Sequence, residues 1–230
     1  MEIKNTEKCL NCGCELPETN RNLGYCSSCA AELKTSEKKK VYVTFYKLKP
    51  EEIDSIVKKQ KTEEKSASNF SPIEDFELDG GVLKKYVGKD SIVRIPDFVT
   101  KIAAFAFFNC TNLIKIHIPE SVTEIGHSAF SGCINLVKVH IPASVTKIAK
   151  FTFSDCTSLK GVYIPDFVTE IGYKAFWNCT NLIGVYVPDY VNYVGMGAFF
   201  NCYQLTISIP NHIKEDLYES FSGCKKIIKR

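Results

Sequence analysis

The sequence predicts a solenoid of stacked coils, rich in β-strand, over residues 73–230. The prediction depends on three residue types that recur together every 23 residues, with a last interval of 22. A fixed period of this size is typical of solenoids, in which units that cannot bury their apolar side alone stack on their neighbours. The recurring residues are Pro96, Pro119, Pro142, Pro165, Pro188 and Pro210; Phe107, Phe130, Phe153, Phe176, Phe199 and Phe221; and Cys110, Cys133, Cys156, Cys179, Cys202 and Cys224.

Each unit is expected to contain one short strand and one helical turn. Val139, His140 and Ile141 alternate between apolar and polar, which is the pattern of a strand with one buried face. Pro142 has no backbone N–H, so it ends this strand and begins the return of the coil. The segment GHSAF (126–130) is too short for a full helix and predicts one helical turn. The expected fold is therefore a parallel strand ladder with short helical turns.

The two ends of the solenoid are expected to differ from its middle, because terminal units face water on one side. An N-terminal cap over 73–95 precedes six units that start at Pro96. Within the cap, Asp79-Gly80-Gly81 predicts a hairpin turn that covers the first coil. The last unit is irregular: Asp216 stands where Ile or Val is expected, and NHIKEDLYESF (211–221) has a helical pattern.

The repeated unit carries a family resemblance. IPESVTEIGHSAFSGCINLVKVHIP (118–142) resembles the BspA-like class of leucine-rich repeats, and FELDGGVLKKYVGKDSIVRIP (76–96) resembles the N-terminal cap of that class. The resemblance covers about two-thirds of the chain, with Cys and Phe where the commoner leucine-rich pattern has Asn and Leu. It implies a right-handed leucine-rich-repeat solenoid that binds other macromolecules. Many proteins of this class are exported to the cell surface.

Four cysteines near the N-terminus predict a structural zinc site in residues 1–36. Cys9-x2-Cys12 and Cys26-x2-Cys29 have the spacing of a zinc ribbon, in which four thiolates surround Zn²⁺ as a tetrahedron. Four protein ligands leave no open position for catalysis. The alternative is two pairs of free or disulfide-bonded thiols. Cys14 is the spare cysteine, with a role near the site, or none, or as a substitute for Cys12.

A basic linker is expected over 37–72. The residues 41–48 alternate and are rich in aromatics, which predicts a strand, and a helical stretch starts at Pro50. The lysines Lys38, Lys39 and Lys40, together with the ribbon, suggest nucleic-acid binding as an alternative function. Interleaved glutamates dilute this positive charge, which favours a solvated linker.

The side chains that face outward from the strand ladder are the expected binding surface for a protein partner. One outward column is basic at one end and aromatic at the other, and tyrosine and arginine dominate the energies of many interfaces. The alternative is that these side chains only stabilise the sheet through cross-strand pairs. The column consists of Arg94, His117, His140, Tyr163 and Tyr186, continued by Ser208, and a second column contains Ile92, Lys115, Lys138, Gly161 and Gly184. His117 and His140 lack a third ligand, so a metal there is not expected.

The remaining patterns argue against an enzyme. The repeat cysteines form part of the core pattern, where thiols are inert, and the chain contains no nucleotide-binding, zinc-protease or serine-hydrolase motif. The net charge is only +3, no apolar run approaches the ~20 residues that cross a bilayer, and the N-terminus has no signal-peptide pattern. We therefore expect a cytoplasmic, non-enzymatic protein-interaction module with no membrane or small-molecule partner.

Overall fold

The computed structural model describes residues 71–213 and 218–230. These residues belong to the second of two compact units, Glu63–Arg230. The predicted zinc ligands, the three lysines and the strand and helix of the linker lie outside the described residues. The helical pattern expected at 211–221 lies partly outside them.

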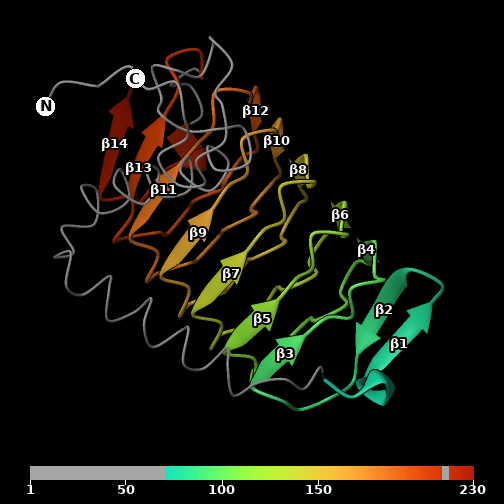
Figure 1. The fold of residues 1–230 in the computed structure, drawn as a ribbon. Coiled ribbons are helices and arrows are strands. Elements are labelled where there is room, and N and C mark those ends of the chain that lie inside the picture. The colour runs from blue at the N-terminus through green and yellow to red at the C-terminus, as the bar shows by residue number, and fades with distance from the viewer. Residues whose placement is uncertain (1–70, 214–217) are drawn as a thin grey trace, which may run out of the picture. The chain divides into compact units, whose positions relative to one another are not determined.

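A parallel ladder of seven strands runs along one side of the solenoid (Figure 1). Its order is β14-β13-β11-β9-β7-β5-β3, so each strand pairs with the strand of the neighbouring coil. The pairing is residue for residue: Lys115 opposes Lys138, Lys138 opposes Gly161 and Gly161 opposes Gly184. The strands are β3 (Ile92–Arg94), β5 (Lys115–His117), β7 (Lys138–His140), β9 (Gly161–Tyr163), β11 (Gly184–Tyr186), β13 (Thr206–Ile209) and β14 (Lys226–Lys229).

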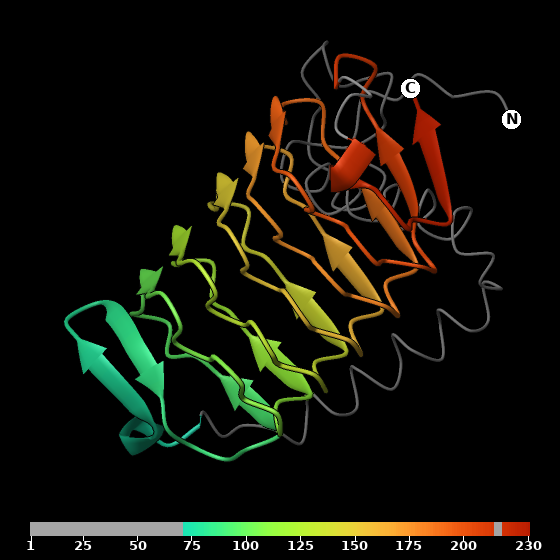
Figure 2. The ribbon, with the colours of Figure 1, turned by 180° about the vertical axis from the view of Figure 1, so that it is seen from behind.

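A second row of two-residue strands lies on another side of the coils (Figure 2). The first two of these strands continue the sheet of the N-terminal hairpin, and the other three form a separate parallel sheet. Each contributes one buried aliphatic residue and one residue that faces outward. The strands are β4 (Lys101–Ile102), β6 (Glu124–Ile125), β8 (Lys147–Ile148), β10 (Glu170–Ile171) and β12 (Tyr193–Val194).

The predicted hairpin is confirmed at the N-terminal end of the solenoid. After a short 3-10 helix, η2 (Ile73–Asp75), strand β1 (Phe76–Asp79) pairs antiparallel with β2 (Val82–Tyr86). Gly80 in the turn has a φ of +57°, which a glycine adopts without steric cost. Strand β2 then pairs in parallel with β4, so the hairpin covers the first coil.

A ladder of stacked aromatic rings forms the centre of the core. Phe107, Phe130, Phe153, Phe176 and Phe199 are all fully buried. Successive rings in this row are near-parallel, with centroids 5.0 to 5.4 Å apart. Tyr86 of the hairpin stacks on the first of them at 5.2 Å, and Phe221 stacks on the last at 5.9 Å. Stacking therefore places like residues on like, as the repeat predicts.

The prediction of a helical turn is wrong for the first five units. Residues 126–131 form hydrogen-bonded turns, because Ser128 has a φ of +54° and a left-handed residue ends a right-handed helix. Left-handed residues form two columns along the solenoid, and each of the first five coils contributes one residue to each column. One contains Phe105, Ser128, Phe151, Lys174 and Gly197, and the other Asn109, Gly132, Asp155, Asn178, Asn201 and Gly223.

The last coil departs from the others, in keeping with its irregular sequence. Its described helical part is one turn of 3-10 helix, η3 (Tyr218–Ser220), which leads into β14. Over the described residues, no helix has the length and apolar character needed to cross a membrane.

Candidate protein-binding face

The long-strand ladder brings the predicted binding residues into one column. Arg94 opposes His117, His140 opposes Tyr163, and Tyr186 opposes Ser208 in the strand register. Neighbouring strands lie about 4.8 Å apart, so the side chains of this column are adjacent. The side chain of His140 is exposed, whereas those of Arg94, His117, Tyr163 and Tyr186 are half-buried and Ser208 is buried.

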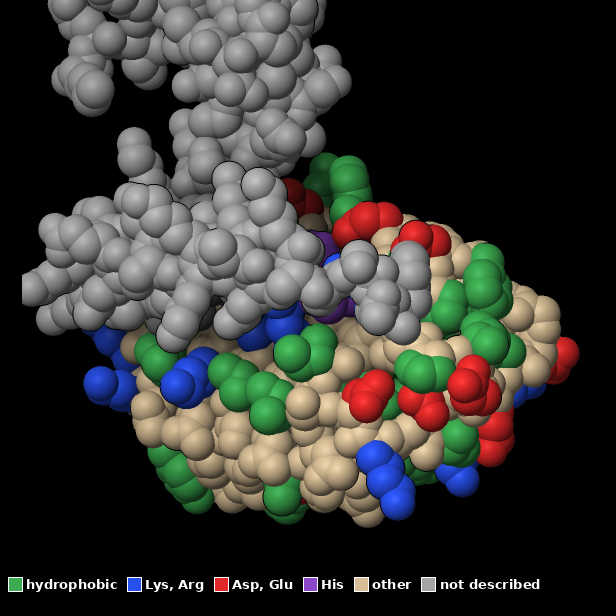
Figure 3. Space-filling view, turned by 60° about the horizontal axis from the view of Figure 1, so that its bottom comes forward, with side chains coloured by type: hydrophobic (Ala, Val, Ile, Leu, Met, Phe, Trp, Pro, Cys, Tyr) green, Lys and Arg blue, Asp and Glu red, His purple; other side chains and the backbone are tan. Residues whose placement is uncertain are grey.

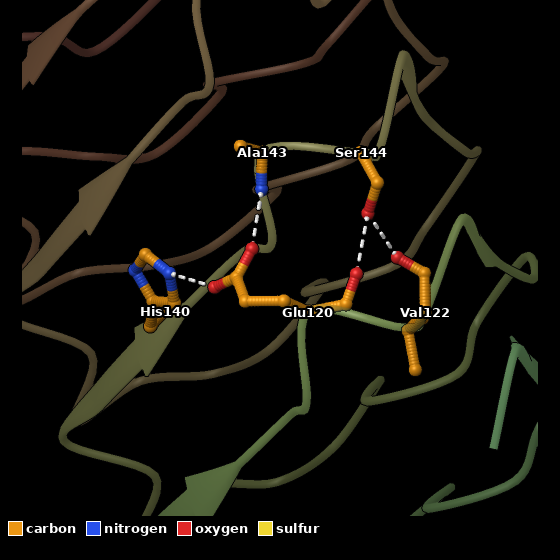
Figure 4. Close-up of polar contacts among 5 residues, drawn as sticks. All are labelled: Glu120, Val122, His140, Ala143 and Ser144. Carbon is orange, nitrogen blue, oxygen red and sulfur yellow. Dashed lines mark hydrogen bonds and ion pairs between the residues drawn. The ribbon is translucent and has the colours of Figure 1, made fainter. Parts of the chain in front are cut away.

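His140 is tied to a carboxylate of the preceding coil (Figure 4). Its Nε2 lies 3.0 Å from Oε1 of Glu120, and Oε2 of the same carboxylate accepts the Ala143 N–H at 3.2 Å. The Ser144 hydroxyl donates to the backbone oxygens of Glu120 and Val122 at 3.2 and 2.5 Å. Glu120 therefore links two coils at this corner. Among the described residues, no cluster of three or more His, Cys, Asp or Glu side chains forms a metal site.

Each tyrosine of the column is linked to the aspartate that follows the proline of its own coil. Tyr163 bonds Asp166 directly, whereas Tyr186 and Asp189 both contact Arg230. The Tyr163 hydroxyl donates to Oδ1 of Asp166 at 3.1 Å. The Tyr186 ring is covered by the guanidinium of Arg230, whose central carbon lies 3.9 Å from the ring centroid. Arg230 also donates to Asp189 Oδ1 and to the backbone oxygen of Val187. These contacts give the aromatic end of the column a carboxylate in each of two adjacent coils.

Aromatic side chains at the proline corners are exposed, and the sequence analysis above did not include them. Phe98, Phe167 and Tyr190 are 56%, 64% and 65% exposed, and the rings of the last two stack at 6.0 Å. The signal in the sequence is the repeated Pro-Asp followed by Phe or Tyr. In Figure 3, exposed hydrophobic side chains (green) lie in several patches along the solenoid, separated by charged side chains.

In other coils, the residue two positions after the proline stabilises the stacking of coils. Ser121, Ser144 and His212 each bond a valine carbonyl of the preceding coil, at 2.7, 2.5 and 2.8 Å. Phe167 has no polar side-chain group, and the Tyr190 hydroxyl makes no such bond to the described residues. Two adjacent coils therefore replace a bond between coils with an exposed ring. Exposed aromatic groups of this kind mark interaction surfaces.

The repeat cysteines are core residues, as the sequence predicts. Cys133, Cys156, Cys179 and Cys202 are fully buried, and each thiol donates to the carbonyl of a phenylalanine 26 residues earlier, at 3.1 to 3.2 Å. Burial raises the pKa of all four thiols. Because the thiolate is the reactive form, these cysteines have no nucleophilic role.

Side-chain amides at the corner before the long strand bond the preceding coil in two coils. The Nδ2 groups of Asn135 and Asn181 donate to the carbonyl oxygens of Thr111 and Thr157, both at 2.8 Å. The acceptors lie in the preceding coil. These side chains therefore stabilise the stacking of coils.

Known structures share this solenoid. A leucine-rich repeat protein of T. pallidum is 26% identical, with a TM-score of 0.59, and the match covers 70% of this chain and 85% of that one. A leucine-rich repeat protein from Bacteroides ovatus is 31% identical, with a TM-score of 0.51 and coverage of 60% and 38%. A leucine-rich cell surface protein from Faecalibacterium prausnitzii is 27% identical, with a TM-score of 0.55 and coverage of 64% and 40%. The match spans about two-fifths of the last two proteins. No curated protein matches the chain.

The family model for the BspA type leucine-rich repeat region matches six copies over residues 89–206. The matched region contains five of the seven ladder strands, β3 to β11, the phenylalanine stack from Phe107 to Phe199, and the outward column from Arg94 to Tyr186. Proteins built from leucine-rich repeats are generally protein-interaction modules without enzymatic activity. The geometry and the match agree, and the chain belongs to the BspA-type leucine-rich repeat family.

Proposed function

We propose that this protein is a non-enzymatic binding module and that its long-strand face recognises a protein partner. The recognition residues are Arg94, His117, His140, Tyr163 and Tyr186. The core positions are nearly the same in every coil, so only outward positions distinguish one coil from the next. Solenoids commonly bind partners through an extended surface of this kind.

The observation that carries the proposal is the concentration of aromatic groups over two adjacent coils. Tyr163 and Tyr186 occupy one column on the strand face, and Phe167 and Tyr190 stack at the neighbouring corner. Neither ring of the stacked pair belongs to the buried core, and the same corner position carries an inter-coil hydrogen bond in other coils. Tyrosine and phenylalanine offer large apolar area at low entropic cost, which suits a binding surface.

Replacement of both column tyrosines by alanine tests the proposal. The double variant Tyr163→Ala/Tyr186→Ala is expected to lose a partner that the wild-type chain captures from native lysate, while it keeps a cooperative unfolding transition. Tyr193→Ala is the matched control, because Tyr193 is exposed but lies on the short strand β12. Capture that survives the double substitution would refute the proposed face.

Salt dependence separates protein binding from the nucleic-acid alternative. Binding to phosphates through Lys38, Lys39 and Lys40 would weaken steeply with added salt, because each neutralised phosphate releases counterions. An aromatic protein contact changes much less with salt. A bound species that is sensitive to nuclease and lost at moderate salt would favour the alternative.

We propose that Cys9, Cys12, Cys26 and Cys29 hold a structural zinc ion. The support is their spacing in the sequence and the supply of four thiolates, which complete a tetrahedral site. The module would provide a second partner contact or a cap. Metal analysis of protein purified without added zinc is expected to give one zinc per chain, lost in Cys12→Ser. If Cys12→Ser keeps its zinc, Cys14 has replaced Cys12 as a ligand. Cys26→Ser is therefore the stricter test, and zinc that remains in this variant would refute the site.

A further inference from the structure

The row of short strands is interrupted between β6 and β8. At each of the other junctions, β4–β6, β8–β10 and β10–β12, the residue before the short strand and the residue after it donate backbone hydrogen bonds to the preceding coil, at 2.7 to 3.0 Å. At the β6–β8 junction the corresponding donors are the N–H groups of Thr146 and Ala149. Over residues 71–213 and 218–230, neither N–H has a backbone acceptor. The bonds at the intact junctions are Thr123 to Thr100, Gly126 to Ile102, Thr169 to Thr146, Gly172 to Ile148, Asn192 to Thr169 and Gly195 to Ile171.

The charged side chains of this row are paired away from the gap. Lys101 bonds Glu124 at 2.8 Å on one side of it, and Lys147 bonds Glu170 at 3.2 Å on the other. Within the described part of the chain, no ion pair of the row crosses from β6 to β8. Backbone and side chains therefore divide the row at the same place.

One methyl group accounts for the gap. The residue after the short strand is glycine at the three intact junctions, and an added Cβ there would lie only 2.4 to 2.7 Å from a backbone nitrogen of the preceding coil. Ala149 occupies this position in the third coil, which starts at Pro142. Its Cβ keeps the backbones from the close approach that the two bonds require. The alanine of the first coil faces the hairpin strand β2 and not another coil. The three glycines are Gly126, Gly172 and Gly195.

The same two coils stay joined on their other sides. Strands β7 and β9 pair over three residues. Three backbone hydrogen bonds of 2.9 to 3.0 Å join the turns, donated by the N–H groups of Ser128, Phe130 and Gly132. At the proline corner, the Ser144 hydroxyl donates to the Val122 carbonyl at 2.5 Å (Figure 4). The junction can therefore open along the short-strand row alone.

We propose that the β6–β8 junction is a hinge, at which the coils before Pro142 and the coils after it bend relative to each other. The bonds on the other sides hold the two blocks together while the short-strand row opens and closes. On the long-strand face, the hinge lies between His140 and Tyr163, where the outward column changes from basic to aromatic. Bending therefore changes the angle at which the two halves of the column face a partner.

Amide hydrogen exchange on the full chain, resolved by residue, tests the gap. In the wild type, the amides of Thr146 and Ala149 are expected to exchange at least about tenfold faster than the bonded amides of Thr169 and Gly172. Ala149→Gly removes the Cβ, and it is expected to slow exchange at positions 146 and 149 by a similar factor. Ala103→Gly is the matched control and leaves both positions unchanged, because the Ala103 N–H already bonds the hairpin at 2.8 Å.

A distance measurement tests the bending. Spin labels are placed at Thr100 and Asn192 as genetically encoded amino acids, so that every native cysteine is kept. Both positions are exposed beside the short-strand row, and they lie four strand spacings apart, about 19 Å, with the gap between them. Pulsed electron paramagnetic resonance is expected to give a narrower distance distribution in Ala149→Gly than in the wild-type background, and no narrowing in Ala103→Gly.

The reverse substitution tests the cause. In Gly172→Ala the new Cβ would lie 2.7 Å from the Lys150 nitrogen, so the β8–β10 junction is expected to open and the amides at 169 and 172 to exchange faster. Unchanged exchange there, or wild-type amides at 146 and 149 as protected as those at 169 and 172, would overturn the assigned gap. A wild-type distribution as narrow as that of Ala149→Gly would overturn the hinge. These measurements involve no partner, so their failure leaves the proposed binding face standing.

Discussion

Removal of one ring from the middle of the phenylalanine ladder is expected to be severely destabilising. Phe153 is fully buried and stacks on Phe130 at 5.4 Å and on Phe176 at 5.3 Å. Replacement of a buried phenylalanine by alanine costs about 3–5 kcal/mol through lost transfer energy and the cavity that remains. Two ring contacts at about 0.5–1.5 kcal/mol each are lost as well, in part already counted in that range. We therefore expect Phe153→Ala to lower the free energy of unfolding by about 4–5 kcal/mol.

Two control variants separate the ladder from simple loss of a ring. Phe221 stands at the end of the row, where Phe199 at 5.9 Å is its one ring contact among the described residues. Phe221→Ala is therefore expected to cost less, about 2–3 kcal/mol. Phe167 is 64% exposed, so Phe167→Ala is expected to change stability by only about 0.5 kcal/mol.

Urea unfolding of the three variants measures these differences. Fluorescence of Trp177, the single tryptophan, reports on the coil next to Phe153, and far-UV circular dichroism reports on the whole ladder. Coincident transitions would justify a single free energy of unfolding. A cost for Phe153→Ala of less than about 2 kcal/mol, or no greater than that of Phe221→Ala, would contradict the stacking argument.

Three further predictions concern the thiols and the glycines. Thiol reagents should modify Cys110 and Cys224, the half-buried ends of the row, before any of the four buried repeat cysteines, as peptide mass mapping of native protein at pH 8 would show. Burial raises the pKa of Cys224 from 9.0 to about 12, so its contribution to stability is complete below pH 9 and is lost as the pH rises towards 12. The urea midpoint should fall between pH 8 and 10.5, and less so in Cys224→Ala. Gly195→Ala should cost about 1–3 kcal/mol in urea unfolding, because the new Cβ would lie 2.4 Å from the Tyr173 backbone nitrogen. Gly80→Ala, with φ +57° but open space, should cost only about 1 kcal/mol.

The ladder could be predicted from sequence because its information is local and repeated. Once Phe130 and Cys133 recur at one spacing, stacking of like on like follows, and the hairpin turn at Gly80 follows from its own residues. The turn at 126–131 could not be predicted, because Ser128 in a left-handed conformation has no strong signature in one residue.

The candidate site was predictable only in part. The outward column follows from alternation along the strands, but the contact of Arg230 with Tyr186 joins residues 44 positions apart. The place of Arg230 depends on strand β14, which directly precedes it. The sequence of the last unit is irregular, so the repeat pattern does not predict this strand. The zinc ligands, the basic linker and the cytoplasmic location stay predictions.

The residue-for-residue register of the long strands has a consequence for how such a protein changes length. Deletion or duplication of one 23-residue unit would bring Lys115 opposite Gly161, or place a second copy of Lys138 opposite the first, without a shift in any other pair. The interior would then meet the same neighbours as before, whereas the outer rows would gain or lose one position. Recombination between units could therefore alter which molecules are recognised while the hydrophobic interior is preserved.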